Sequence, residues 1–148
     1  MLFLRWRIDG AQQVVLPAYA GTGRADDLWK TTCFEMFLDL GDGAYRELNF
    51  SPSGRWAAYD FSGYRISSGN SDLQAWPETS VERGDAIIAG AVRVPEEALA
   101  GATRGAFTAV IEEEGGVMSF WATGHHKGEP DFHDTTCFTT DFGSPDEP

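Results

Sequence analysis

The chain has 148 residues, 42% of them hydrophobic and 13% aromatic, which is enough apolar material for one domain with its own core. Its formal net charge of −12 argues against nucleic acid and anionic membranes as partners, because both are bound through clustered Lys and Arg. No stretch reaches the ~18 apolar residues of a membrane span, and residues 1–8 lack the features of a signal peptide. The sequence as given therefore predicts a cytoplasmic protein, or a periplasmic or secreted one if a leader was removed.

Alternation of apolar and polar residues with a period of two predicts β-strands in the first half of the chain. The predicted strands are 1–8, 33–40, 45–50 and 55–61. Glycine-containing turns separate the last three of them. The polar, Gly- and Ser-rich stretch 62–85 predicts a short strand or two and a long loop.

The second half continues the same pattern. Strands are predicted at 86–94, 105–113, 117–124 and 137–142, with one short helix at 95–101 and a loop at 125–134. Short, regularly spaced strands with almost no helix are typical of an antiparallel β-sandwich or barrel. We therefore expect one domain over residues 1–142, followed by a disordered tail at 143–148.

Both cysteines lie in a repeated string, "TTCF", at 31–34 and 135–138. Two cysteines do not make a disulfide-dense scaffold, although one bridge between Cys33 and Cys137 is open. A cysteine inside a strand pattern is usually a small buried apolar residue. We expect both strings to enter strands, with buried, reduced cysteines.

The sequence contains none of the common catalytic motifs: no G-x-S-x-G, no phosphate-binding glycine loop, no H-E-x-x-H and no C-x-x-C. A hydrolase built on the carboxylates of Glu35 and Glu47 is one alternative. His125, His126 and His133 share a loop but do not have a standard zinc spacing. We expect no cofactor, and leave a structural calcium open because acidic residues are abundant.

Aromatic residues give a stronger signal than these motifs. Trp29 follows "RADD" and directly precedes a strand, and Phe132 holds a similar place in the last loop. A ring fixed at such a junction can stack on the apolar face of a sugar or another planar ligand. The simpler alternative is that Trp29 covers the core, as we expect Trp6 to do from its alternation with Leu4 and Ile8.

Three segments in chain order carry a resemblance to a known family. "LWKTTCFEMFLDL" (28–40) resembles a strand of the family-9 carbohydrate-binding modules and their DOMON-like relatives, in which a Trp precedes a Glu by six positions, as Trp29 precedes Glu35. "YRELNFSPSGRWAAYDF" (45–61) resembles the next strand and turn. "GEPDFHDTTCF" (128–138) resembles the C-terminal segment, where an aromatic and a basic residue precede the last strand. The match is closest to the bacterial DOMON-like subgroup.

The resemblance implies a single antiparallel β-sandwich, of the immunoglobulin or jelly-roll type, that binds sugars without cleaving them. Two aromatic rings would clamp the sugar, and polar side chains would hydrogen-bond its hydroxyl groups. By position the ligand-binding residues would be Trp29, Glu35, Glu47, Asn49, Phe132 and His133. Alternation supports part of this set, because Glu35, Glu47 and Asn49 lie on strand faces opposite apolar residues.

This chain departs from the family pattern at specific positions. Sugar-binding members have a second Trp where this chain has Phe132, and a cationic residue where it has Glu47. An acidic residue between the Trp and the Glu is replaced within "TTC". The main alternative is therefore a ligand-free structural or protein-interaction domain. A haem domain using Met36 or Met118 is a further alternative, since other DOMON domains hold haem through Met and His.

Overall fold

The computed structural model describes residues 1–124 and 131–143, and in these ranges the chain is mostly β-strand. Its strands are β1 (Leu2–Asp9), β2 (Gly23–Arg24), β3 (Cys33–Gly41), β4 (Ala44–Phe50), β5 (Arg55–Gly63), β6 (Ile66–Asn70), β7 (Glu78–Arg83), β8 (Ile87–Val94), β9 (Arg104–Glu113), β10 (Val117–Ala122) and β11 (Thr140–Asp141). The helical segments are short: α1 (Glu96–Leu99) and the 3₁₀ helices η1 (Ala11–Gln13), η2 (Leu28–Lys30) and η3 (Thr135–Cys137).

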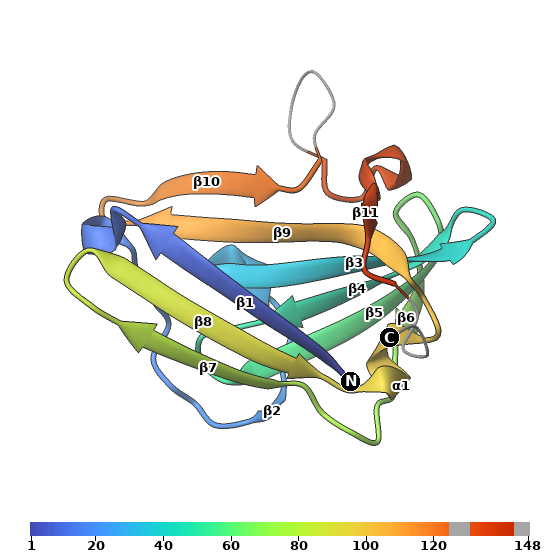
Figure 1. Ribbon diagram of the computed structural model, residues 1–148, viewed down its shortest axis with the longest axis horizontal. Helices are drawn as coiled ribbons and strands as arrows, with labels where there is room; N and C mark the ends of the chain where they lie inside the picture. Colours follow the sequence, from blue (N-terminus) through green and yellow to red (C-terminus); the bar gives the residue numbers. More distant parts are fainter. Residues whose placement is uncertain (125–130, 144–148) are drawn as a thin grey trace.

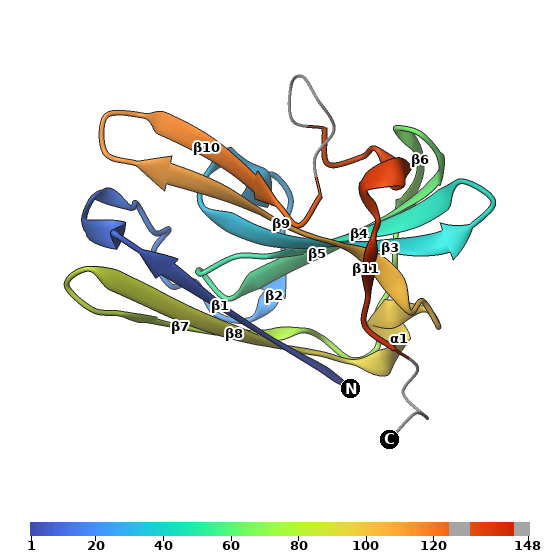
Figure 2. The same cartoon turned by 45° about the horizontal axis from the view of Figure 1, so that its top comes forward.

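The described strands form two sheets, neither of which closes on itself (Figure 1). The larger sheet has the order β10-β9-β3-β4-β5-β2, with β6 also paired to β5 and β11 to β9. The smaller sheet has the order β1-β8-β7. Figure 2 shows the smaller sheet as a layer along one side of the larger sheet, and the segment that contains η3 on the other side.

The core lies between the two sheets, where each contributes one face of its strands. The smaller sheet supplies Leu2, Leu4 and Trp6 from β1 and the buried Val92 and Val94 from β8. The larger sheet supplies the buried residues Met36, Leu38, Leu48, Phe50, Trp56 and Ala58. Alternation with a period of two turns these side chains inward together, and it turns the residues between them to the opposite face.

The prediction of an all-β fold is therefore confirmed, and so are two sequence predictions about single elements. The stretch 62–85 holds two short strands, β6 and β7, and the predicted helix near 95–101 is the single turn α1. Trp6 is half-buried and packs on the core, with its ring stacked on Phe34 at 4.0 Å between centroids. The finer assignment to a single sandwich of the family-9 type stays a prediction.

Two predictions about strands are wrong. The short β2–β5 pair is parallel, so the strands are not all antiparallel. The stretch 137–142 is not one strand: Cys137 ends the 3₁₀ helix η3, and β11 contains only two residues. The physical reason is the Asp134 side chain, which accepts hydrogen bonds from the Thr136 backbone N–H at 3.0 Å and the Thr136 hydroxyl at 2.6 Å. This cap turns the chain where an extended strand was expected.

Both cysteines are buried and free, as predicted, but only one of them lies in a strand. Cys33 begins β3 as a buried free thiol, so it forms no bridge with Cys137. Cys137 is also buried, but its "TTCF" string is helical and does not enter a strand.

Two other predicted segments lie mostly outside the described residues. The predicted tail 143–148 does so apart from Gly143, and the predicted loop 125–134 does so apart from 131–134. Within the described ranges, no helix is both long enough and apolar enough to cross a membrane.

Candidate functional site

The outer face of the larger sheet, turned away from the core, carries a set of polar and aromatic side chains. Strand pairing places these side chains in two adjacent rows across β9, β3, β4 and β5. The rows are Thr108–Glu35–Asn49–Ala57 and Ala106–Phe37–Glu47–Tyr59. Residues far apart in sequence therefore become direct neighbours on one surface.

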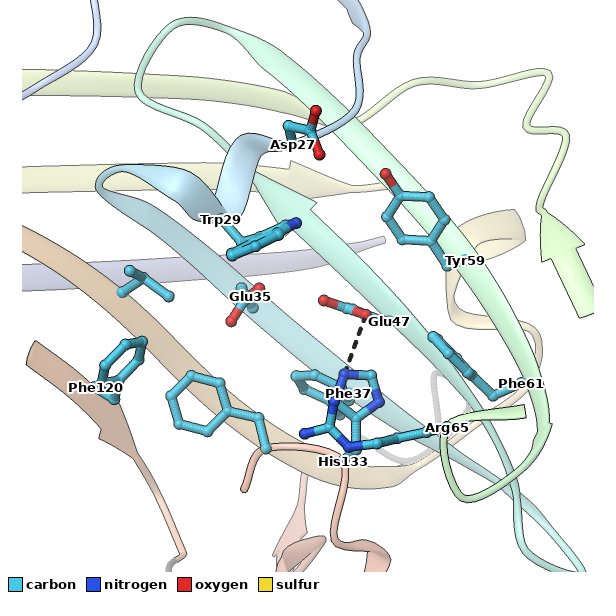
Figure 3. Close-up of a pocket in the computed structure, with 12 residues that line it drawn as sticks. Asp27, Trp29, Glu35, Phe37, Glu47, Tyr59, Phe61, Arg65, Phe120 and His133 are labelled. Atoms are coloured by element: carbon cyan, nitrogen blue, oxygen red, sulfur yellow. Dashed lines mark ion pairs between the residues drawn. The ribbon is translucent and has the colours of Figure 1, made fainter. Parts of the chain in front are cut away.

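A pocket of about 480 Å³ opens on this face (Figure 3). Its size is within the range of small-molecule sites, which is about 300–1,000 Å³. It is lined by Asp27, Trp29, Glu35, Phe37, Glu47, Tyr59, Phe61, Arg65, Val110, Phe120, Phe132 and His133. Five of the six ligand-binding residues expected from the sequence line it. The sixth, Asn49, is buried between the two glutamates.

Two buried glutamates form the polar floor of the pocket. Glu35 is 5% exposed and Glu47 is 8% exposed, so neither is an ordinary outward-facing polar residue. Their carboxyl groups are close enough to share a hydrogen bond, which requires at least one of them to carry a proton. Burial and the negative charge of Glu47 hold the pKa of Glu35 well above its usual range, and burial also raises the pKa of Glu47.

Neighbouring groups on β4 and β9 complete this floor. The Asn49 amide satisfies its nitrogen only when that nitrogen faces the carboxyl groups, where it donates to Glu47 Oε1 and Glu35 Oε2, each at 3.1 Å. The Thr108 hydroxyl donates to Glu35 Oε1 at 3.2 Å. The Glu35 carboxyl group is therefore held from both strands that flank β3, and both glutamates line the pocket.

His133 forms one side of the floor as a neutral imidazole. Burial and the nearby charge of Arg65 lower the pKa of His133 to about 4. The buried Tyr45 hydroxyl accepts from the Arg65 backbone N–H at 3.1 Å and shares a hydrogen bond with His133 Nδ1, with 2.6 Å between oxygen and nitrogen. The other ring nitrogen, Nε2, lies 3.7 Å from Glu47 Oε2.

Arg65 closes the same side of the pocket at its rim. It occupies the left-handed region, with φ 54°, in the turn between β5 and β6. Its guanidinium pairs with Asp131 at 3.0 Å and also donates to the Tyr64 hydroxyl at 3.2 Å. The hydroxyl of Tyr64 in turn donates to Asp131. These contacts join the β5–β6 turn to the segment that carries His133.

Trp29 stands on the opposite side of the glutamates from His133 and Arg65 (Figure 3). It lies in η2, which packs against β3, β4 and β5. Asp27 begins this turn in a left-handed conformation and pairs with Lys30 at 3.4 Å. The indole is 52% exposed, so Trp29 does not cover the core.

Further aromatic rings form the walls of the pocket. The Phe132 ring lies 6.4 Å from the buried Phe37 ring and 6.2 Å from Phe120, both in edge-on contacts. Trp29 and Phe132, which are over a hundred residues apart in the chain, therefore line the same pocket. Rings around hydrogen-bonding groups suit a ligand that has both apolar faces and polar edges.

Sequence reasoning missed several of the pocket residues. Alternation along β5 could have identified Tyr59 and Phe61, because they share a face opposite the buried Trp56 and Ala58. Arg65 carried no comparable signal, since it lies in a polar stretch and reaches the pocket only through a turn.

The structure also bears on metals and haem. Within residues 1–124 and 131–143, no group of three or more His, Cys, Asp or Glu side chains is arranged to hold a metal ion. His125 and His126 lie outside these residues. Met36 is fully buried in the core, on the face opposite the pocket, and could not reach a haem bound there.

Comparisons with known proteins agree with the fold and leave the family open. No family model matches the chain, and no curated protein matches it. Among solved structures, the chain is similar to the crystal structure of "a putative carbohydrate-binding protein" from Bacteroides uniformis, with a TM-score of 0.63. The match covers 93% of this chain and 70% of the other at 14% identity, so it shows the likeness of the fold alone.

Proposed function

We propose that this pocket binds a saccharide, or a related small polar ligand, without cleaving it. The observation that carries the proposal is the half-exposed indole of Trp29 in the same pocket as two buried carboxyl groups. A sugar presents C–H faces to aromatic rings and hydroxyl edges to carboxyl and amide groups, so both parts of the site have a role. Glu35, Glu47, Asn49 and His133 would hold the hydroxyls, and Trp29 and Phe132 the ring.

Two independent lines support the proposal. The sequence resembles family-9 carbohydrate-binding modules in three segments that contain these residues, and the similar solved structure carries a carbohydrate-binding description. On this basis we assign the two sheets to a single, DOMON-like β-sandwich domain.

The arrangement of the glutamates favours binding over hydrolysis. Glycosidases place two carboxyl groups about 5–9.5 Å apart, on either side of the bond to be cleaved. The Asn49 amide nitrogen instead lies 3.1 Å from an oxygen of each carboxyl group, so Glu35 and Glu47 lie side by side on the pocket floor and do not flank a bond to be cleaved. The pair is therefore better suited to accept hydrogen bonds at the end of a ligand.

Replacing Trp29 tests the proposal. Calorimetric titration of the protein with a panel of mono- and disaccharides should identify a ligand, and Trp29→Ala should weaken its binding about tenfold or more, because the stacking surface is lost. Trp121→Ala is the matched control: Trp121 is also exposed, at 63%, but its strand pairing with Ala109 places it on the opposite face.

A wild-type protein that binds none of these sugars would contradict the proposal and favour the ligand-free, protein-interaction alternative. Equal losses in the Trp29 and Trp121 variants would show that the sugar does not bind in this pocket.

A further inference from the structure

The floor of the pocket holds a negative charge that the ligand must accommodate. Glu47 accepts hydrogen bonds from the Glu35 carboxyl and from the Asn49 amide nitrogen, the latter at 3.1 Å. Accepted hydrogen bonds favour the charged form of a carboxyl group, so Glu47 is the carboxylate of the pair and Glu35 carries the proton. Both residues are buried, Glu35 with 5% and Glu47 with 8% of its surface exposed. A charge removed from water is costly unless an opposite charge or several hydrogen-bond donors compensate it.

The other groups around the pair do not supply a positive charge. Its neighbours are the neutral Asn49 and Thr108, the neutral imidazole of His133, and Cys33, Tyr45 and Tyr59, whose pKa values are raised chiefly by burial. These groups are all uncharged at pH 7. The buried charge is therefore met by hydrogen bonds alone at short range.

Each described cation near the pocket is already paired with a carboxylate of its own. The pairs are Arg65 with Asp131 at 3.0 Å, Lys30 with Asp27 at 3.4 Å and Arg24 with Asp26 at 3.1 Å. Arg65 also acts on Glu47 from a distance, but its side chain is 56% exposed, so solvent screens that interaction. In the described part of the chain around the pocket, each of these cations is neutralised by its own carboxylate. None of them is left to neutralise the negative charge of the glutamate pair.

The Glu47 carboxylate still has capacity to accept a hydrogen bond. Besides the bond from Glu35, its Oε1 accepts from Asn49, whereas Oε2 lies 3.7 Å from His133 Nε2, which is beyond hydrogen-bond length. A carboxylate can accept about four hydrogen bonds. The surrounding rings add a second favourable term, because the faces of Trp, Tyr and Phe attract cations.

We propose that the preferred ligand is an amino sugar, with its protonated amine against Glu47 and its ring against Trp29. This inference rests on the proposed function, because it identifies the class of saccharide that the same pocket takes. The ammonium group would supply both the missing positive charge and the missing donor. A charge-assisted hydrogen bond of this kind is stronger than the bond that a hydroxyl makes at the same place.

Matched pairs of sugars test the proposal on the wild-type protein. Glucosamine and galactosamine differ from glucose and galactose only at one carbon, where an ammonium replaces a hydroxyl. N-acetylglucosamine retains the nitrogen without the charge. 6-Amino-6-deoxyglucose moves the amine to another carbon. We expect at least one amino sugar to bind about tenfold or more tightly than its neutral partner in calorimetry at pH 7 and 150 mM NaCl.

Two variants separate the pocket from general attraction to an acidic protein. Glu47→Gln keeps the shape of the side chain and removes its charge, so the preference for the amine should fall to about threefold or less. Glu82→Gln removes one charge from an exposed position on β7, in the other sheet, and should keep the full preference. If Glu47→Gln fails to fold, the comparison of amino sugars with neutral sugars on the wild-type protein still tests the proposal.

The possible failures of the two proposals can be distinguished. Neutral sugars that bind as tightly as their amino partners, or more tightly, would overturn the amino-sugar inference and leave the saccharide function intact. A preference that survives in Glu47→Gln, or falls equally in Glu82→Gln, would also overturn it. A protein that binds none of the sugars, neutral or amino, would overturn both proposals.

Discussion

At the scale of single residues, the properties of Glu35 follow from its neighbours. The strand pairing puts Asn49 on one side of it and Thr108 on the other, and the carboxyl of Glu47 closes the group. In water a glutamate would be ionised at pH 7, but here burial and a second acid favour the protonated form. The site thus favours a protonated Glu35 that can donate a hydrogen bond to Glu47.

This pair should make the stability of the protein depend on pH. A carboxyl group whose pKa is raised on folding stabilises the fold fully below its unfolded pKa of about 4.3, and this contribution is lost as the pH rises through the folded pKa. Glu35→Gln mimics the protonated form at every pH. We therefore expect it to raise the free energy of unfolding by about 1–3 kcal/mol at pH 8, and by almost nothing at pH 4.

Urea unfolding of the variant and the wild-type protein at pH 4, 6 and 8 checks this expectation. Glu82→Gln is the control for removing one acid from an exposed strand and should show no such trend. A Glu35→Gln variant that is less stable than the wild-type protein by the same amount at all three pH values would contradict the raised pKa.

At the scale of elements, the short helix η3 determines where the last part of the site lies. It begins two residues after His133, and the Asp134 side chain between them caps its first turn through two hydrogen bonds to Thr136. Phe138, just after η3, packs against Phe37 beneath the pocket, at 5.8 Å between ring centroids. The turn thus anchors the segment on the sheet and places its aromatic and imidazole side chains over the glutamates.

Removing the cap should affect stability and binding together. Asp134→Ala is expected to cost about 1 kcal/mol of stability, because it removes the acceptor for the Thr136 N–H. It should also weaken the binding of the saccharide found in the titrations, since Phe132 and His133 lose their support. Asp134→Asn keeps an acceptor in place and serves as the matched control. An alanine variant as stable and as tightly binding as the asparagine variant would show that the cap has no such role.

At the scale of the whole molecule, the larger sheet separates the pocket from the core. Its inner face packs on the smaller sheet, and its outer face lines the site. Trp6 is tightly packed on two sides: its indole stacks on Phe34 of the larger sheet at 4.0 Å, and within the smaller sheet it pairs with Gly90 across β1 and β8. A Cβ atom added at Gly90 would lie 2.2 Å from the Trp6 indole, closer than atoms can approach.

Gly90→Ala should therefore lower stability without changing ligand binding. The indole would have to move from its stack on Phe34, and such overpacking costs about 1–3 kcal/mol. Gly63→Ala in β5 is the control, because its added Cβ would be 3.4 Å from the end of the flexible Ile66 side chain. Thermal unfolding and sugar titration of both variants check the prediction. A large loss of affinity in Gly90→Ala would show that the two faces are coupled.

The sequence alone determined most of the longer strands and the faces of their side chains, because alternation with a period of two is a local property of an extended chain. Alternation placed Glu35, Glu47 and Asn49 opposite the core, and the structure confirms this placement. The family resemblance selected the loop residues Trp29 and Phe132, which the structure brings to the same pocket.

Only the tertiary structure decided how these parts combine. Pairing between distant strands set the neighbours of Glu35, the cap at Asp134 replaced a predicted strand with a turn, and a second turn brought Arg65 to the rim. Burial and protonation depend on every group packed around a site. Long-range contacts set both properties, and for this reason no local pattern in the sequence could have revealed the raised pKa values of the two glutamates on the pocket floor.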